Sequence, residues 1–273
     1  MNQASDGPGD GEPTAGYTAL LGHHLPTELD RLRALEETFD PTTNRVLTEL
    51  GVGPGWRCLE LGAGGGSVAR WLRQRCGPGA VVVTDLDTRL LEDLGDGVEV
   101  LRHDLTRDDF PEAGFDLVHA RAVLMHLPDP RRQLERITRW VAPGGWLVVE
   151  DPVLHLAESS PHPEYHRMVA VLREFLTRGI GSDFVWARAL PRHFAELGLV
   201  DLRLTPMVAV VGTGGSPDRM WRLLLEQIGE PLTREGVATA ADVRGWRDLF
   251  DDPSFVDLNL TMVSMAGRRP PRP

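Results

Sequence analysis

The sequence predicts one α/β domain wound around a mostly parallel sheet, and three observations carry this prediction. Short apolar runs alternate with stretches of helical spacing between about residues 56 and 151. The run at residues 80–86 is continuously apolar, as in strands buried on both faces. A glycine-rich turn follows the first run. Strands that alternate with helices form parallel sheets with right-handed crossovers.

The first expected elements are helices that precede the strands. Leucines recur at helical spacing before Asp40-Pro41, so we expect a helix over residues 17–40 that ends there. A short helix over residues 43–50 should follow. Because both segments precede the sheet, we expect residues 17–50 to pack across it as an N-terminal helical cap. Residues 1–16 and 268–273 are polar or proline-rich and are predicted to be disordered tails.

The core elements follow in chain order. We expect strands over residues 56–61, 80–86, 98–104, 115–120 and 146–151, with helices over residues 66–76, 88–94 and 129–141 between them. In the last of these helices, Asp129 suits the N-cap and Pro130 the first position. After residue 151 we expect helices over 163–178 and 190–198, a strand over 199–212, a helix that begins at Ser216, and a strand over 255–267. The core domain is therefore placed at residues 51–267, with helical insertions at about 153–188 and 215–250.

The composition argues against several kinds of partner. The formal net charge is −11, all 29 basic residues are arginine, and these arginines are mixed with acids. We therefore expect neither nucleic acid nor an anionic membrane as partner. Neither an apolar run of about 18 residues nor a secretory signal is recognisable. The two cysteines, Cys58 and Cys76, are predicted to be buried and reduced, which favours a cytoplasmic location.

The glycine-rich turn, "LELGAGGGS" at residues 59–67, leads from the first strand into a helix. Such a turn exposes backbone at the carboxyl edge of a parallel sheet, where ligands usually bind. The dinucleotide fingerprint G-x-G-x-x-G is incomplete, because Ser67 stands in place of its third glycine. The turn fits E-x-G-x-G-x-G instead, with Glu60, Gly62, Gly64 and Gly66. This pattern resembles motif I of the class I methyltransferases that use S-adenosylmethionine (SAM).

Further segments extend the resemblance to about residues 45–212. Asp85 ends the second strand, where an acid can accept both ribose hydroxyls. Asp104 ends the third strand, where the family has an acid for the adenine amino group. Leu86 and Leu105, beside these acids, are expected to sandwich the adenine. The segments "FDLVHARAVLMHLPDP" (115–130) and "WVAPGGWLVVEDP" (140–152) are similar to the family's segments after strand four and around strand five.

The resemblance implies a Rossmann-like, doubly wound sheet of seven strands, mostly parallel with an antiparallel last strand. It implies SAM as cofactor, S-adenosylhomocysteine as product, and no metal. The methionine end of SAM is expected near His119, Ala120 and Arg121. Arg121 pairs either with the SAM carboxylate or in a structural ion pair. Methyl transfer is an in-line displacement, so alignment and desolvation can supply much of the rate.

The methyl acceptor is expected to be a small apolar or aromatic molecule, because the cap and insertions should enclose the site. This is typical of bacterial methyltransferases of secondary metabolism, including antibiotic biosynthesis, and of the ubiquinone/menaquinone type. The candidates for a catalytic role are His155, just beyond strand five, its rival Asp151, and Tyr17 in the cap. Transfer to O, N or C stays open, as does a homodimer. The alternatives are a nicotinamide-dependent oxidoreductase and a SAM-binding protein without transfer activity.

Overall fold

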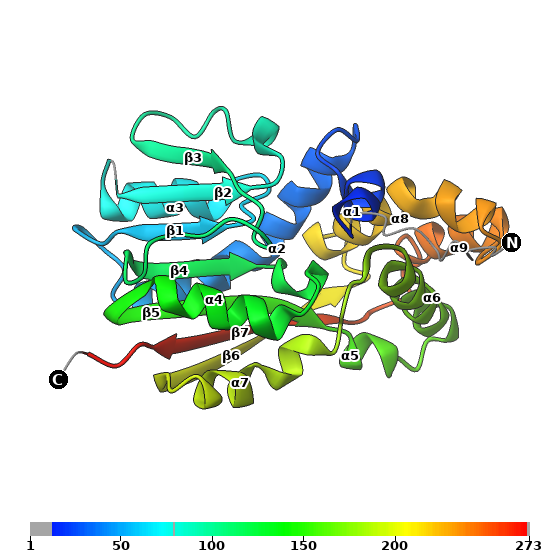
Figure 1. Cartoon of the computed structure of the whole chain (residues 1–273). Coiled ribbons are helices and arrows are strands. Elements are labelled where there is room, and N and C mark those ends of the chain that lie inside the picture. Colours follow the sequence, from blue (N-terminus) through cyan, green and yellow to red (C-terminus); the bar gives the residue numbers. More distant parts are fainter. Residues whose placement is uncertain (1–12, 79, 272–273) are drawn as a thin grey trace, which may run out of the picture.

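A seven-stranded sheet forms the middle layer of the computed structural model, which describes residues 13–78 and 80–271 (Figure 1). The strand order is β3-β2-β1-β4-β5-β7-β6. The strands are β1 (Cys58–Leu61), β2 (Val81–Asp85), β3 (Val98–Arg102), β4 (Phe115–Arg121), β5 (Val141–Val153), β6 (Val200–Val211) and β7 (Asp257–Arg268). Only β7 pairs antiparallel, with β5 on one side and β6 on the other. The predicted doubly wound sheet with an antiparallel last strand is confirmed.

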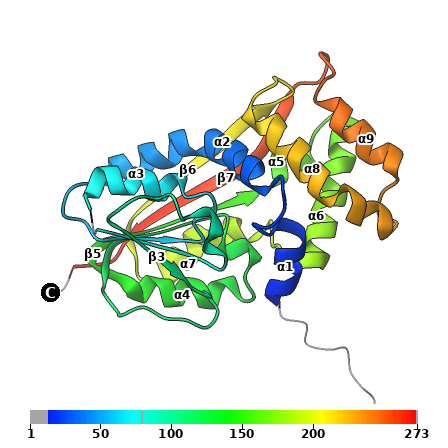
Figure 2. The same cartoon turned by 90° about the horizontal axis from the view of Figure 1, so that it is seen from above.

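Helices cover both faces of the sheet and one of its ends. In Figure 2, α2 (Glu28–Glu49) and α3 (Ser67–Cys76) lie on one face, and α4 (Pro130–Trp140) and α7 (Leu190–Glu196) lie on the other. Four further helices gather beyond the carboxyl ends of the parallel strands and are called the cap below: α1 (Pro13–Leu21), α6 (Pro163–Ile180), α8 (Ser216–Arg234) and α9 (Ala240–Leu249). The short α5 (His155–Glu158) leads from β5 toward α6.

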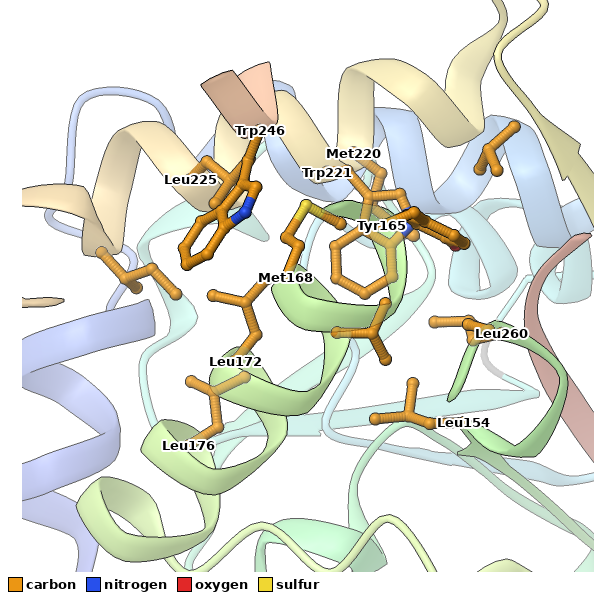
Figure 3. Close-up of a cluster of buried hydrophobic side chains, with 14 of the residues drawn as sticks. Leu154, Tyr165, Met168, Leu172, Leu176, Met220, Trp221, Leu225, Trp246 and Leu260 are labelled. Carbon is orange, nitrogen blue, oxygen red and sulfur yellow. The ribbon is translucent and has the colours of Figure 1, made fainter. Parts of the chain in front are cut away.

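The cap has an apolar core separate from the cores that flank the sheet. Tyr165, Met168 and Trp246 are fully buried there, and residues of α1, α2, α6, α8, α9 and β7 belong to the same cluster (Figure 3). On the α4 face, Leu134 and Ile137 recur at helical spacing and are likewise fully buried. No helix within residues 13–78 and 80–271 is long and apolar enough to cross a membrane.

The predicted division of the N-terminal helices is wrong. The chain forms α1 and α2 instead of a helix over residues 17–40, and α2 continues through Pro41. At the break, a Cβ atom on Gly22 would lie 2.1 Å from the carbonyl oxygen of Thr18. Within α2, Arg121 bonds to Asp40 at 2.8 Å and to Thr43 at 3.0 Å, so contacts on both sides of Pro41 hold the helix together. Of the predicted tails, residues 1–12 and 272–273 lie outside the described residues, whereas residues 13–16 belong to α1 and Arg268 ends β7, which pairs it with β5 and β6.

Two later predictions also differ from the structure. The helix expected over residues 88–94 is only a 3₁₀ turn, Thr88–Leu90. The amides of Leu91 and Leu94 each bond to a carbonyl three residues earlier, and this spacing turns both leucines inward beside the glycine loop. Helix α9 was not predicted, although Thr239 begins it with a capping box. The N-cap Asp129 and the first-turn Pro130 of α4 are confirmed.

Candidate cofactor and substrate site

The glycine loop takes a backbone conformation that other residues rarely adopt. Gly62, Gly64 and Gly66 have φ angles of 61°, 56° and 80°. A Cβ atom on Gly62 would lie 2.4 Å from the Val123 side chain, so this position also requires glycine for its close packing. The loop thus presents bare backbone between β1 and α3, at the carboxyl edge of the sheet.

Two carboxylates stand at the same edge, as the sequence predicts. Asp85 ends β2 and accepts a hydrogen bond from the Gly64 amide at 2.9 Å, which ties the loop to the neighbouring strand. Burial raises the pKa of Asp85 above its ordinary value, against hydrogen bonds and His23 that lower it. Asp104 follows β3 and accepts from the amide and hydroxyl of Thr106, at 2.8 and 2.7 Å. Both acids are therefore held in fixed orientations beside the loop.

A cavity of about 260 Å³ lies between this edge and the cap. One end is lined by the predicted cofactor residues Glu60, Gly62, Gly64, Asp85, Leu86, Asp104, Leu105 and Arg121. The other end is lined by apolar side chains of the cap and its neighbours, among them Leu172, Leu176, Met220, Trp221 and Leu260 (Figure 3). The cavity therefore has a polar floor at the sheet and an apolar roof. Gly66, His119 and Ala120 do not line it.

His119 on β4 lies beneath the cavity and contacts a carboxylate on each of the two neighbouring strands, β1 and β5. Its Nδ1 is 2.7 Å from Glu60 Oε2 and its Nε2 is 3.5 Å from Glu150 Oε2, and all three side chains are buried. Burial alone lowers the pKa of His119, but the two carboxylates outweigh it and raise the pKa to about 9. Burial raises the pKa of Glu150, but His119 and Arg121 outweigh it and lower the pKa to about 2. An imidazolium between two carboxylates therefore fixes Glu60 at the cavity floor.

Arg121 forms a structural ion pair, one of the two roles left open by the sequence. It bonds to Asp40 at 2.8 Å and donates to Thr43 and to Ser67 at 3.0 and 3.3 Å. Thr43 in turn donates to Glu150 at 2.5 Å. These contacts link α2, α3, β4 and β5, so α2 is fastened to the cofactor edge of the sheet through Arg121.

The three predicted catalytic residues occupy different environments. Tyr17 lines the cavity, and its ring meets the His126 ring edge-on with centroids 5.0 Å apart. Asp151 is buried outside the lining and accepts from the Val123 amide and the Trp186 indole, at 3.1 and 3.0 Å. Burial raises the pKa of Asp151 to about 8 despite these bonds. His155 begins α5 with its side chain 44% exposed, also outside the lining.

Sequence reasoning missed several polar residues of the cavity wall, among them Arg31 and His126. Arg31 on α2 is buried, and it lies among the leucines that predict the helix. Glu28, one helical turn earlier, was a signal for an ion pair at this point. His126 also lines the cavity, and its Nδ1 lies 2.9 Å from the Ser182 hydroxyl. Burial, with Arg31 nearby, lowers the pKa of His126 to about 3, so its ring is neutral at physiological pH.

Comparisons with known proteins agree with this geometry. A family model described as a methyltransferase domain matches residues 21–204. Methyltransferase str2 of Strobilurus tenacellus is 33% identical over 125 residues, which are 45% of this chain and 46% of that protein. This chain therefore covers less than half of that relative. Methyltransferase GfsG of Streptomyces halstedii is 26% identical over 245 residues, 86% of this chain and 83% of that protein.

A solved structure shares the fold. Phosphoethanolamine N-methyltransferase 2 of Haemonchus contortus, in complex with phosphomonomethylethanolamine and S-adenosylhomocysteine, superposes with a TM-score of 0.61 at 18% sequence identity. The superposition covers 96% of this chain and 61% of that one. It extends beyond the sheet into most of the cap sequence.

Proposed function

The chain belongs to the methyltransferase-domain family, and from this premise we propose that it transfers a methyl group from SAM to a small apolar or aromatic molecule. The observation that carries the proposal is a cavity that joins a polar strand edge to an apolar roof. SAM supplies a methyl group already activated on a sulfonium. The family match removes the support for a nicotinamide oxidoreductase, which the missing third glycine at Ser67 already disfavoured.

The residues at the polar end suit this cofactor. Bare backbone at Gly62 and Gly64 leaves room for a ligand, and Asp85 has the position of a ribose-binding acid. The Glu60 carboxylate suits the positive charge of the methionine end. Leu86 and Leu105 line the cavity beside Asp104, where an apolar sandwich for adenine is expected. Gly66 contributes by shaping the turn, and His119 and Ala120 contribute from below the cavity.

The protein's part in the reaction is alignment and exclusion of water, together with proton removal where the acceptor requires it. Of the predicted catalytic residues, Tyr17 is in the cavity lining, next to the neutral ring of His126. Burial raises the pKa of Tyr17 and lowers that of His126, so the pair is placed to orient the acceptor by hydrogen bonds and does not act as a base at neutral pH. Asp151 and His155 remain hypotheses from the sequence, and each would need a rearrangement of its surroundings to reach a bound acceptor.

Two further parts of the proposal rest on composition and burial. A small molecule is favoured over nucleic acid or a membrane surface because the net charge is −11. A cytoplasmic location is supported by Cys58 and Cys76, which are buried free thiols with sulfur atoms 3.5 Å apart. A role in secondary metabolism is supported by the likeness to GfsG, a Streptomyces methyltransferase.

The test compares ligands on the purified chain. S-adenosylhomocysteine should raise the melting temperature and NAD should not, and methyl-labelled SAM should label an apolar component of a bacterial extract. Stabilisation by NAD alone would contradict the proposal. Binding of SAM with no labelled acceptor in any extract would favour the SAM-binding protein without transfer activity. Asp85→Ala should weaken SAM binding, measured by calorimetry, by about tenfold to hundredfold through loss of the ribose contact.

A further inference from the structure

Arg31 is a buried cation in the cavity wall that the methyl transfer described above does not use. It lies on α2 with its side chain 10% exposed. Its Nε and Nη2 donate to Glu28 Oε2 and Oε1 at 2.8 and 2.7 Å. Glu28 is fully buried and also accepts from Gln227 Nε2 at 2.8 Å. Two parallel bonds therefore hold the guanidinium in one plane, and α8 supports its partner.

This pairing leaves part of the guanidinium available. An arginine carries five N–H donors, and the bonds to Glu28 use two of them. Within residues 13–78 and 80–271, no side chain or carbonyl accepts a hydrogen bond from Arg31 Nη1. Nη1 is not one of the fully buried atoms that lack a partner, and Arg31 lines the cavity, so this donor is open to the cavity. A ligand in the cavity can supply the acceptor.

The other arginines of the cavity wall are differently placed. Arg121 is committed to Asp40, Thr43 and Ser67. Arg173 pairs with Glu158 at 2.8 Å and Arg107 with Asp104 at 3.5 Å, and both are half-exposed or more, so water screens their charges. Arg31, by contrast, is buried in the wall near Tyr17 and His126, and its charge acts to lower the pKa of both. Arg31 therefore presents a buried guanidinium edge to the cavity, with its charge balanced by Glu28 on the other edge.

We propose that Arg31 binds an oxyanion of the methyl acceptor and that Glu28 is its positioning residue. The substrate is then an apolar or aromatic body that carries one anionic oxygen, and a carboxylate is the form that stays charged at neutral pH. The apolar roof encloses the body, and Arg31 sets its direction in the cavity relative to Tyr17 and His126. This inference rests on the proposed function, because it concerns the same cavity.

The test uses two probes of equal shape on the full chain. We expect 1-naphthoate to bind about tenfold to hundredfold more tightly than the uncharged 1-naphthamide, as measured by calorimetry with and without S-adenosylhomocysteine. The double variant Glu28→Gln/Arg31→Gln removes both charges together and should abolish this preference. Arg31→Lys keeps the positive charge but loses the planar set of N–H donors, and it should reduce the preference for 1-naphthoate several-fold. Arg173→Gln is the matched control and should leave the preference unchanged.

Three results would overturn the inference: equal binding of the two probes by the wild type, no binding of 1-naphthoate at millimolar concentration, or a preference that Arg31→Lys and the double variant both retain. The melting temperature and S-adenosylhomocysteine affinity of each variant report separately on folding and on the cofactor end. If the wild type fails to bind S-adenosylhomocysteine yet prefers 1-naphthoate through Arg31, the proposed function fails and the anion site stands.

Discussion

The two ends of the cavity are built in different ways. At the cofactor end, backbone geometry decides the shape, because Gly62 and Gly64 turn the chain and Asp85 bonds to a loop amide. At the cap end, side chains from α1, α2, α6 and α8 meet from distant parts of the sequence. The shape of the cofactor end is therefore sensitive to any atom added to the glycine loop. The cap end, in contrast, can change its lining by substitution of single side chains. This division suits an enzyme family with one methyl donor and many acceptors.

The largest effect is expected from Gly62→Ala. A residue with Cβ at φ 61° is strained, and its Cβ would overlap Val123 at 2.4 Å. We expect a loss of about 2–6 kcal/mol in the free energy of unfolding and at least a hundredfold loss of S-adenosylhomocysteine affinity. Denaturant unfolding and calorimetry measure the two quantities.

The matched control for this change is Gly236→Ala. Gly236 has a φ angle of 69° but nothing within 4 Å of an added Cβ, so it isolates the backbone strain. It should cost about 1 kcal/mol and leave the cofactor affinity unchanged. If both variants bound S-adenosylhomocysteine as the wild type does, the loop would not form the cofactor floor.

The same division explains what the sequence could predict. The strand rhythm, the glycine loop and the acids that follow β2 and β3 are local patterns, and the structure brings Glu60, Asp85 and Asp104 to one cavity. The cap depends on long-range packing. Nothing near Pro41 in the sequence shows that Arg121 will hold α2 together across it. Likewise, Arg31 joins the wall only because α2 and α8 pack together around Glu28.

A change in the cap should affect stability without affecting the cofactor. Met168 is fully buried between cap helices and does not line the cavity (Figure 3). Met168→Ala should cost about 2–5 kcal/mol in the free energy of unfolding through lost packing and a residual void. S-adenosylhomocysteine affinity should stay within about threefold when measured well below the melting temperature. A parallel loss of affinity would show that the two ends are not separable.

The buried charges under the cofactor end predict a pH dependence. The pKa of His119 is raised from 6.5 to about 9, so its stabilising effect is fully present below pH 6.5 and is lost as the pH rises through 9. His119→Asn removes this contribution. The difference in unfolding free energy between wild type and variant should shrink by about 3 kcal/mol from pH 6.5 to pH 9.

The wild type must be compared with the variant because a second group, Asp151, titrates in the same pH range. Burial raises the pKa of Asp151 from 3.8 to about 8, so its effect on stability is also lost as the pH rises through 8. Asp151 is present in both proteins, so most of its contribution cancels in the difference, and what is left acts only through Glu150. A difference that stayed constant between pH 6.5 and pH 9 would show that His119 is not an imidazolium in the native state.

The smallest effect is expected from His155→Ala. This variant tests whether a residue chosen for its position in the sequence acts in catalysis although it lies outside the cavity lining. His155 follows strand five, as an acceptor-site base should, but its half-exposed ring points toward Glu158 and Arg188 at 4.0 and 3.5 Å. Exposed contacts of this kind contribute little. Turnover of the labelled acceptor should therefore stay within about threefold of wild type, whereas Tyr17→Phe should lower it about tenfold, because it removes a hydroxyl that can orient the acceptor in the cavity. A tenfold drop in His155→Ala at unchanged S-adenosylhomocysteine affinity would restore the histidine as the base and would require α5 to move toward the cavity during the reaction.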